Sequence, residues 1–122
     1  MIEQITPVAI ARAFTEAWTG NDMEQVANYV ADQVVFDGPM GHVEGRDAYI
    51  ESLKGLIGFM GITGAQIVTA FGDETQALIM YELNTTKFGP LLCAKLLTLQ
   101  DGRIARDRLT FDSYVVRQPQ GA

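Results

Sequence analysis

Apolar residues recur at helical spacing in the first half of the chain, whereas in the second half they alternate with polar residues at strand spacing. Three helices are predicted, over residues 7–19, 22–30 and 45–54. Five strands are predicted, over residues 34–37, 67–72, 75–85, 91–99 and 104–116. The pattern indicates an α+β fold, with three N-terminal helices packed on one face of a curved, mixed or antiparallel sheet.

The ends of the first two helices carry local sequence signals. Thr6 is a suitable N-cap, and Pro7 occupies the first helical position, where its missing N–H costs nothing. Gly20 ends this helix. Asp22 and Gln25 then resemble a capping box, so the second helix is expected to begin there.

Glycines at positions 55, 58, 61 and 64 interrupt the apolar segment after the third helix. Each glycine inside a helix weakens it by about 1 kcal/mol. The segment lacks the strand and the Lys-Ser/Thr step of a phosphate-binding loop. We therefore expect the helix to loosen into a mobile apolar loop, which serves either as a surface connector or as a flexible lid over a pocket.

The last two strands are joined by a predicted three-residue loop, residues 100–102, in which Gly102 can adopt a left-handed conformation. This loop places Lys95 opposite Asp107 and Leu99 opposite Arg103, and it pairs apolar residues at the other positions of the hairpin. A slip of one residue would place Lys95 opposite Arg108, so the first register is preferred.

The preferred register places Lys95 and Asp107 among apolar side chains on the concave face of the sheet. Buried charges are costly unless they contact each other or a ligand, so the pair is a candidate acid/base site. Asp107 is the predicted general base or acid, Lys95 would keep it ionised or stabilise an oxyanion, and Tyr81 would donate a hydrogen bond. A structural ion pair, or an edge open to water, is the alternative.

The residues predicted to line a ligand cavity are mainly large and apolar: Phe14, Trp18, Phe36, Met60, Leu109 and Phe111, with His42 at the mouth. Phe14 and Trp18 serve equally well as plain core. His42 is the only histidine and titrates near neutral pH, although a lone histidine in a loop is commonly solvent-exposed. Asp37 precedes a Gly-Pro step, where carboxylates often cap turns.

The charge and the residue composition of the chain disfavour several kinds of binding partner and cofactor. The chain has 122 residues and a net charge of −6, which disfavours binding to nucleic acid or an anionic membrane. One cysteine and one histidine provide neither a disulfide nor the ligands of a metal site. No leader and no membrane-spanning run of 18 apolar residues is visible, so a cytoplasmic protein without a cofactor is expected.

The opposite face of the predicted sheet is also rich in apolar residues: Leu78, Met80, Leu92, Ala94 and Leu96. An antiparallel sheet with one wet face should alternate more cleanly between apolar and polar residues. A second copy of the chain would cover this face, and a homodimer is therefore expected.

The run from Ala11 to Leu53, ARAFTEAWTGNDMEQVANYVADQVVFDGPMGHVEGRDAYIESL, resembles the SnoaL-like and ketosteroid isomerase-like branch of the nuclear transport factor 2-like superfamily. The resemblance includes the Gly-Asn-Asp step after the first helix, the Ala-Asp step before the first strand, and the glycine before the third helix. The closing DGRI and FD segments extend it over nearly the whole chain. It implies an α+β cone that encloses a hydrophobic pocket.

The resemblance does not carry over the catalytic groups of ketosteroid isomerase. The position of its helix-one tyrosine falls on Phe14, that of its catalytic base on Gly38, one residue after Asp37, and that of its protonated acid near Lys95. The Arg-x-Asp step of limonene epoxide hydrolases is also missing. SnoaL-type cyclases use an aspartate on the sheet, and Asp107 is its counterpart here.

Residues 1–117 are thus expected to form a single domain, followed by a frayed tail at 118–122. The leading function is a cofactor-independent acid/base enzyme of the isomerase, cyclase, dehydratase or epoxide hydrolase type, acting on a small apolar oxygenated substrate. The alternatives are a non-catalytic binding module for a hydrophobic ligand and a protein-interaction module.

Overall fold

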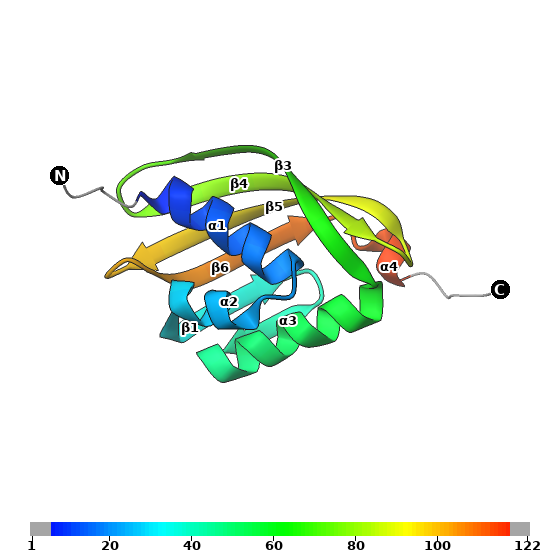
Figure 1. The fold of residues 1–122 in the computed structure, drawn as a ribbon, viewed down its shortest axis with the longest axis horizontal. Coiled ribbons are helices and arrows are strands. Elements are labelled where there is room, and N and C mark those ends of the chain that lie inside the picture. The colour runs from blue at the N-terminus through cyan, green and yellow to red at the C-terminus, as the bar shows by residue number, and fades with distance from the viewer. Residues whose placement is uncertain (1–5, 118–122) are drawn as a thin grey trace.

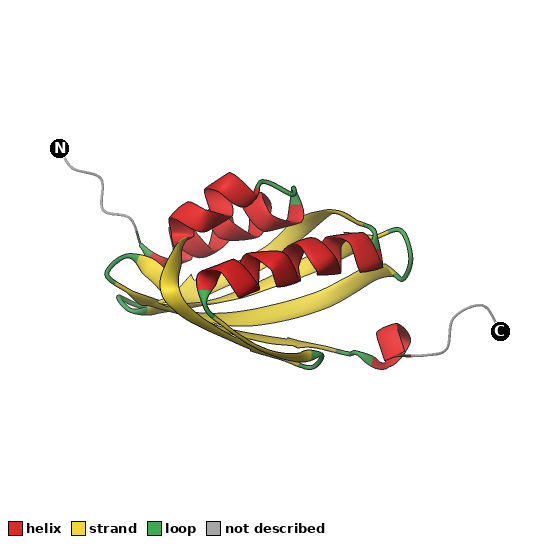
Figure 2. Ribbon diagram, turned by 90° about the horizontal axis from the view of Figure 1, so that it is seen from below, coloured by secondary structure: helices red, strands yellow, loops and turns green. Residues whose placement is uncertain are grey.

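The computed structural model describes residues 6–117, in which three helices pack on the concave face of a curved sheet (Figures 1 and 2). These helices are α1 (Pro7–Thr19), α2 (Met23–Tyr29) and α3 (Arg46–Met60), and a short fourth helix, α4 (Tyr114–Arg117), follows the last strand. The strands are β1 (Val30–Gly38), β2 (Gly41–Glu44), β3 (Ile62–Gly72), β4 (Gln76–Thr85), β5 (Gly89–Gln100) and β6 (Arg103–Phe111). The predicted tail at 118–122 lies outside the described residues. None of the described helices has the length and apolarity needed to span a bilayer.

The sheet is mixed, and the predicted α+β fold class is confirmed. Its strand order is β2-β1-β6-β5-β4-β3, with β1 and β6 parallel and the other neighbours antiparallel. β2 was not predicted, because the Gly/Pro turn before it was read as the start of a loop. α3 packs against β1 and β2 at one end of the sheet.

The predicted N-caps of the first two helices are confirmed. The Thr6 hydroxyl accepts a hydrogen bond from the Ala9 backbone N–H at 3.1 Å. The Asp22 carboxylate accepts one from the Gln25 N–H at 3.3 Å. Each side chain satisfies a backbone donor that has no partner within its helix.

The prediction that the glycine-rich segment loosens into a loop was wrong. α3 continues through Gly55 and Gly58 to Met60 and ends at Gly61, which adopts the left-handed conformation with φ of 68°. Its buried stripe ends at Met60, which is 1% exposed, so packing against the core outweighs the low helix propensity of the glycines.

Two of these glycines should respond to alanine in opposite directions. A Cβ at Gly58 would meet nothing within 4 Å, whereas at Gly61 it would overlap the Thr86 Oγ1 and require a positive φ. Gly58→Ala is expected to raise the free energy of unfolding by about 0.5–1 kcal/mol. Gly61→Ala is expected to lower it by more than about 1 kcal/mol. Urea denaturation measures both changes, and equal effects would contradict this account of the helix end.

The β5–β6 register differs from the prediction by two residues. The loop has two residues rather than three, Asp101 and Gly102, both with positive φ, so that Gln100 pairs with Arg103. A bulge near Ala105 then moves the pairing by one more residue, and Lys95 lies opposite Leu109.

The two one-residue errors cancel in their effect on side-chain direction. A slip of one residue turns every side chain to the other face, whereas a slip of two restores it. Lys95 and Asp107 therefore both face the concave side as predicted, although they are diagonal rather than direct neighbours.

The boundaries of the remaining strands also differ from the prediction. β6 ends at Phe111, because the chain turns at Asp112, whose carboxylate accepts from the Tyr114 N–H, and continues as α4. β1 and β3 each begin several residues earlier than predicted, at Val30 and Ile62. β1 pairs with β6 in parallel, mainly through residues 35–37, with one further pair between Val30 and Ile104.

Candidate functional site

A cavity of about 400 Å³ lies between α3, the β1–β2 hairpin and the inner face of β5 and β6. Five of the residues predicted to line it do so: Trp18, Phe36, His42, Leu109 and Phe111. Phe14 and Met60 do not. Phe14 is fully buried in the core, and Met60 lines a separate side cavity of about 10 Å³.

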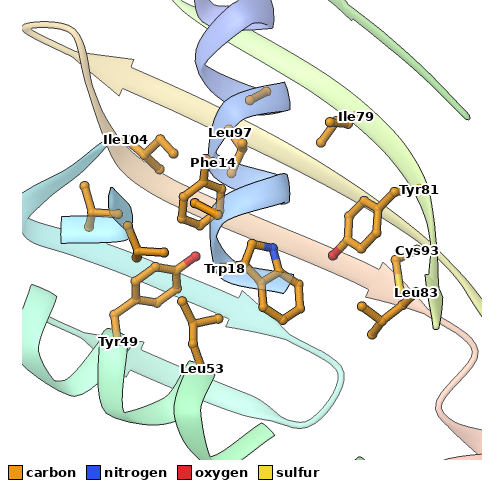
Figure 3. Close-up of a cluster of buried hydrophobic side chains, with 14 of the residues drawn as sticks. Phe14, Trp18, Tyr49, Leu53, Ile79, Tyr81, Leu83, Cys93, Leu97 and Ile104 are labelled. Carbon is orange, nitrogen blue, oxygen red and sulfur yellow. The ribbon is translucent and has the colours of Figure 1, made fainter. Parts of the chain in front are cut away.

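Aromatic side chains from three elements meet above the sheet (Figure 3). Phe14 and Trp18 come from α1, Tyr49 from α3 and Tyr81 from β4. The Phe14 and Tyr49 rings stack with centroids 6.3 Å apart, and the Trp18 and Tyr81 rings meet edge-on at 6.3 Å. These contacts fix the directions in which the two tyrosine hydroxyls point.

Lys95, Asp107 and Tyr49 form a polar cluster at the bottom of the cavity. Lys95 Nζ lies 2.8 Å from Asp107 Oδ2, and the Tyr49 hydroxyl donates a hydrogen bond to the same oxygen. Lys95 is 1% exposed and Asp107 is 0% exposed, so the predicted pair is inside the protein. Lys95 and Tyr49 line the cavity, whereas Asp107 lies behind them.

The local chain geometry explains how Asp107 reaches this position. Ile104 and Asp107 are both fully buried on the concave side, although they are three positions apart. A regular strand would turn them to opposite faces. The bulge near Ala105 takes up the extra residue and turns the Asp107 carboxylate toward Lys95.

Aromatic rings surround the Lys95 ammonium on its other sides. Its Nζ lies 4.9 Å from the ring centroid of Trp18, 5.3 Å from that of Phe14 and 5.8 Å from that of Phe36. Ring faces attract a cation but accept no conventional hydrogen bond. One N–H of Lys95 is therefore held by Asp107, and the other two have no oxygen acceptor among the described residues.

Two buried side-chain atoms among the described residues have no hydrogen-bond partner: Trp18 Nε1, a donor, and Asp107 Oδ1, an acceptor. Both belong to residues that surround Lys95. Buried polar atoms are nearly always paired, so these two atoms near Lys95 call for a water molecule or a polar group of a ligand as a partner.

Tyr49 is the site residue that sequence reasoning missed. Its position in the apolar stripe of the third helix suggested plain core, and no local signal indicated that its hydroxyl would reach Asp107, 58 positions later. Burial and the nearby Asp107 charge raise the pKa of Tyr49 well above its usual value, so its hydroxyl remains a donor at neutral pH.

Tyr81, the predicted donor, lies instead on the side cavity together with Cys93. Burial raises the pKa of Tyr81 well above its usual value, and that of Cys93 to about 11. Cys93 is therefore a thiol at neutral pH and a poor nucleophile. Within residues 6–117, no three His, Cys, Asp or Glu side chains gather closely enough to hold a metal ion.

His42 lies on β2 at the cavity mouth, held by two carboxylates. Its Nδ1 lies 2.6 Å from Asp37 Oδ1 and its Nε2 lies 2.8 Å from Glu44 Oε2. Hydrogen bonds to Glu44 and Asp37 raise the pKa of His42, and the bond from His42 lowers the pKa of Asp37. His42 is thus half-exposed, as a loop histidine would be, but is paired within a strand.

The hydrogen bonds of His42 to two carboxylates should make the stability of the β1–β2 hairpin depend on pH. Because its folded pKa lies above the unfolded value, its stabilising effect on the hairpin is complete below the unfolded pKa and is lost as pH rises through the folded pKa. The chain has one histidine, so its NMR ring signals are unambiguous. We expect a midpoint above 6.5 that moves down in Glu44→Gln. A midpoint unaffected by this substitution would contradict the pairing.

Comparisons with known proteins agree with the fold. The sequence profile of the SnoaL-like domain matches residues 11–107. A solved structure from Kribbella flavida is 32% identical over 94% of this chain and 93% of its own, with a TM-score of 0.85. No match to a curated protein was found by sequence comparison.

Two further solved structures share the fold at lower sequence identity. An NTF2-like protein from Cytophaga hutchinsonii is 21% identical over 97% of this chain and 100% of its own, with a TM-score of 0.82. An LEH-like epoxide hydrolase from M. tuberculosis is 20% identical over 88% of this chain and 84% of its own, with a TM-score of 0.75. Likeness at this level of identity supports the α+β cone and leaves the reaction to the site itself.

Proposed function

This chain belongs to the SnoaL-like domain family, and from that premise we propose that it is an acid/base enzyme acting on a small apolar molecule that carries a carbonyl or epoxide oxygen. The observation that carries the proposal is the polar cluster, which combines a cation, a carboxylate and a phenol at the bottom of an apolar cavity. Such a cavity selects apolar substrates, and a few polar groups orient them.

In the proposed reaction, Lys95 binds the substrate oxygen. Its ammonium has N–H groups to spare, and it stabilises negative charge that develops on that oxygen in the transition state. Asp107 positions the ammonium and exchanges a proton with it. Tyr49, rather than Tyr81, supplies the phenol, because its hydroxyl is bonded to Asp107.

The cavity volume suits this class of substrate. A volume of about 400 Å³ accepts a molecule of two or three fused rings and is at the small end of known ligand sites. Phe36, Leu109 and Phe111 offer apolar contacts to its body. His42 stands at the entrance, where both its nitrogens are already bonded to carboxylates, so we assign it no proton transfer in the reaction.

A panel of apolar ketones and epoxides tests the proposal. Exchange of the α-protons of 2-tetralone in D₂O is followed by NMR, and hydrolysis of indene oxide by chromatography. We expect the protein to accelerate at least one reaction, and Lys95→Met to lose about 100-fold or more of that acceleration. Lys54→Met is the matched control, because Lys54 is exposed on α3 and should leave the rate unchanged.

The competing function is a non-catalytic binding module. The position of Asp107 behind the cavity wall favours it, since a general base must reach the proton that it removes. Trp18 is the only tryptophan and lines the cavity, so its fluorescence reports binding. Binding of panel members without conversion of any of them would replace the enzyme with the binding module.

We also propose that a second copy of this chain covers the outer face of the sheet. Exposed apolar side chains lie on three adjacent strands: Val68, Phe71, Leu78, Met80 and Leu92. The same face carries Glu82 and Arg108, so two copies related by a two-fold axis can pair opposite charges. Light scattering is expected to give a dimer, and Leu92→Asp a monomer. A monomeric wild-type protein would contradict this arrangement.

A further inference from the structure

We propose that Lys95 is also a nucleophile, and that its amine condenses with an apolar aldehyde or ketone in the cavity to form a protonated imine. This inference rests on the proposed function in placing a carbonyl group at the bottom of the cavity. It goes further in assigning a covalent bond between Lys95 Nζ and the carbonyl carbon.

The position of Lys95 gives the amine access to a bound carbonyl group. Lys95 lies on the cavity wall, while its side chain is only 1% exposed overall. The rings of Trp18 and Phe36 stand at 4.9 and 5.8 Å from Nζ, and they keep the surroundings apolar. A carbonyl carbon that enters beside them meets the nitrogen with little competing water.

Its surroundings distinguish Lys95 from the other two lysines of the chain. Lys54 and Lys87 are exposed on the surface, where water stabilises the ammonium form. Lys95 has a single hydrogen-bond partner, the carboxylate of Asp107. Asp107 Oδ2 lies 2.8 Å from Lys95 Nζ, so transfer of one proton within the pair gives a reactive amine.

The proposed step is balanced within the cluster. Asp107 Oδ2 takes one proton from Lys95 Nζ, and the nitrogen lone pair forms a bond to the carbonyl carbon. The carbonyl π pair moves to its oxygen, which takes a second proton from the nitrogen and gives a carbinolamine. Asp107 returns its proton to this hydroxyl, which leaves as water while the nitrogen lone pair forms the C=N bond. The protonated imine remains paired with the Asp107 carboxylate.

Tyr49 holds the Asp107 carboxylate in place during this step. Its hydroxyl bonds to the Asp107 oxygen that faces Lys95, so the carboxylate keeps a hydrogen bond when its proton moves. Asp107 Oδ1, which has no partner in the described protein, can accept a hydrogen bond from the carbinolamine hydroxyl. The cluster thus has a group for every proton that the condensation moves.

Reductive trapping tests the inference. The protein is incubated with 2-naphthaldehyde and sodium cyanoborohydride, and the products are mapped by mass spectrometry of proteolytic peptides. We expect one reduced adduct, on Lys95, formed at least about tenfold faster than any adduct on Lys54, Lys87 or the α-amino group. An excess of 2-methylnaphthalene, which has the same shape without the carbonyl, should suppress this adduct alone.

Variants provide the matched controls. Lys95→Arg keeps the charge beside Asp107 and should abolish the trapped adduct, whereas a Lys54→Arg and Lys87→Arg double variant should retain it. The peptide map of the wild-type protein locates the adduct even if the Lys95→Arg variant fails to fold. Labelling spread over the surface lysines would overturn the inference.

The outcome is separable from that of the proposed function. Quenching of Trp18 fluorescence by the aldehyde, or conversion of the ketone panel, without an adduct on Lys95 would leave the proposed function in place and remove the nucleophile. An adduct on Lys95 without any proton exchange or epoxide hydrolysis would support the nucleophile and contradict the proposed function.

Discussion

Replacing Asp107 with asparagine is expected to lower the free energy of unfolding by about 3–5 kcal/mol, because Lys95 would remain charged in the core without its partner. Both side chains are at most 1% exposed, and their charged atoms lie 2.8 Å apart. The substitution keeps the shape of the side chain, so a large effect would come from charge and hydrogen bonding. Urea denaturation monitored by circular dichroism measures it.

Asp32→Asn is the matched control for this substitution. Asp32 also forms a 2.8 Å ion pair, with Arg46, but its side chain is 78% exposed. Exposed pairs contribute about 0–1 kcal/mol. A comparable loss of stability in the Asp107 and Asp32 variants would contradict the buried ion pair.

A double variant separates the cost of an unpaired charge from the value of the pair. Lys95→Met combined with Asp107→Leu removes both charges and fills the space with apolar atoms. Since buried pairs are often no better than apolar replacements, the double variant should recover most of the stability lost by Asp107→Asn. Recovery of stability without recovery of activity would assign the pair to function rather than to folding.

The sequence predicted the buried pair correctly even though the predicted β5–β6 register was wrong by two residues. The face of a residue depends only on whether the register shift is odd or even. The hairpin loop was predicted one residue too long and the bulge near Ala105 was not predicted. Each error moved the pairing by one residue, so Lys95 and Asp107 stayed on the predicted face. The helix caps were predicted because they depend on residues three positions apart.

Other features depend on tertiary contacts that no local pattern carries. α3 stays helical through Gly55 and Gly58 because its buried apolar stripe, which ends at Met60, packs against the core. β2 was missed because its pairing with β1 follows a short turn of Gly/Pro composition. The choice between Tyr49 and Tyr81 required the three-dimensional position of α3 over the sheet, which brings residues 49 and 107 together.

The hydroxyl of Tyr49 should contribute strongly to stability. Tyr49→Phe is expected to lower the free energy of unfolding by about 1.5–3 kcal/mol, the range for hydrogen bonds to charged groups. The ring stays and keeps its contact with Phe14, so the loss would come from the hydroxyl that donates to Asp107. The same denaturation experiment measures the change.

Tyr81→Phe is the control, because Tyr81 is 1% exposed, is also an aromatic neighbour of the cluster and loses only a hydroxyl. Its hydroxyl has the neutral Cys93 thiol as its hydrogen-bond partner, and Asp107 acts on it only through its charge, so removal of the hydroxyl should cost less than about 1 kcal/mol. In the ketone assay Tyr49→Phe should also slow turnover more than Tyr81→Phe does, because only Tyr49 contacts the carboxylate that exchanges a proton with Lys95. The reverse order in both assays would return the donor role to Tyr81 and contradict the assignment of Tyr49.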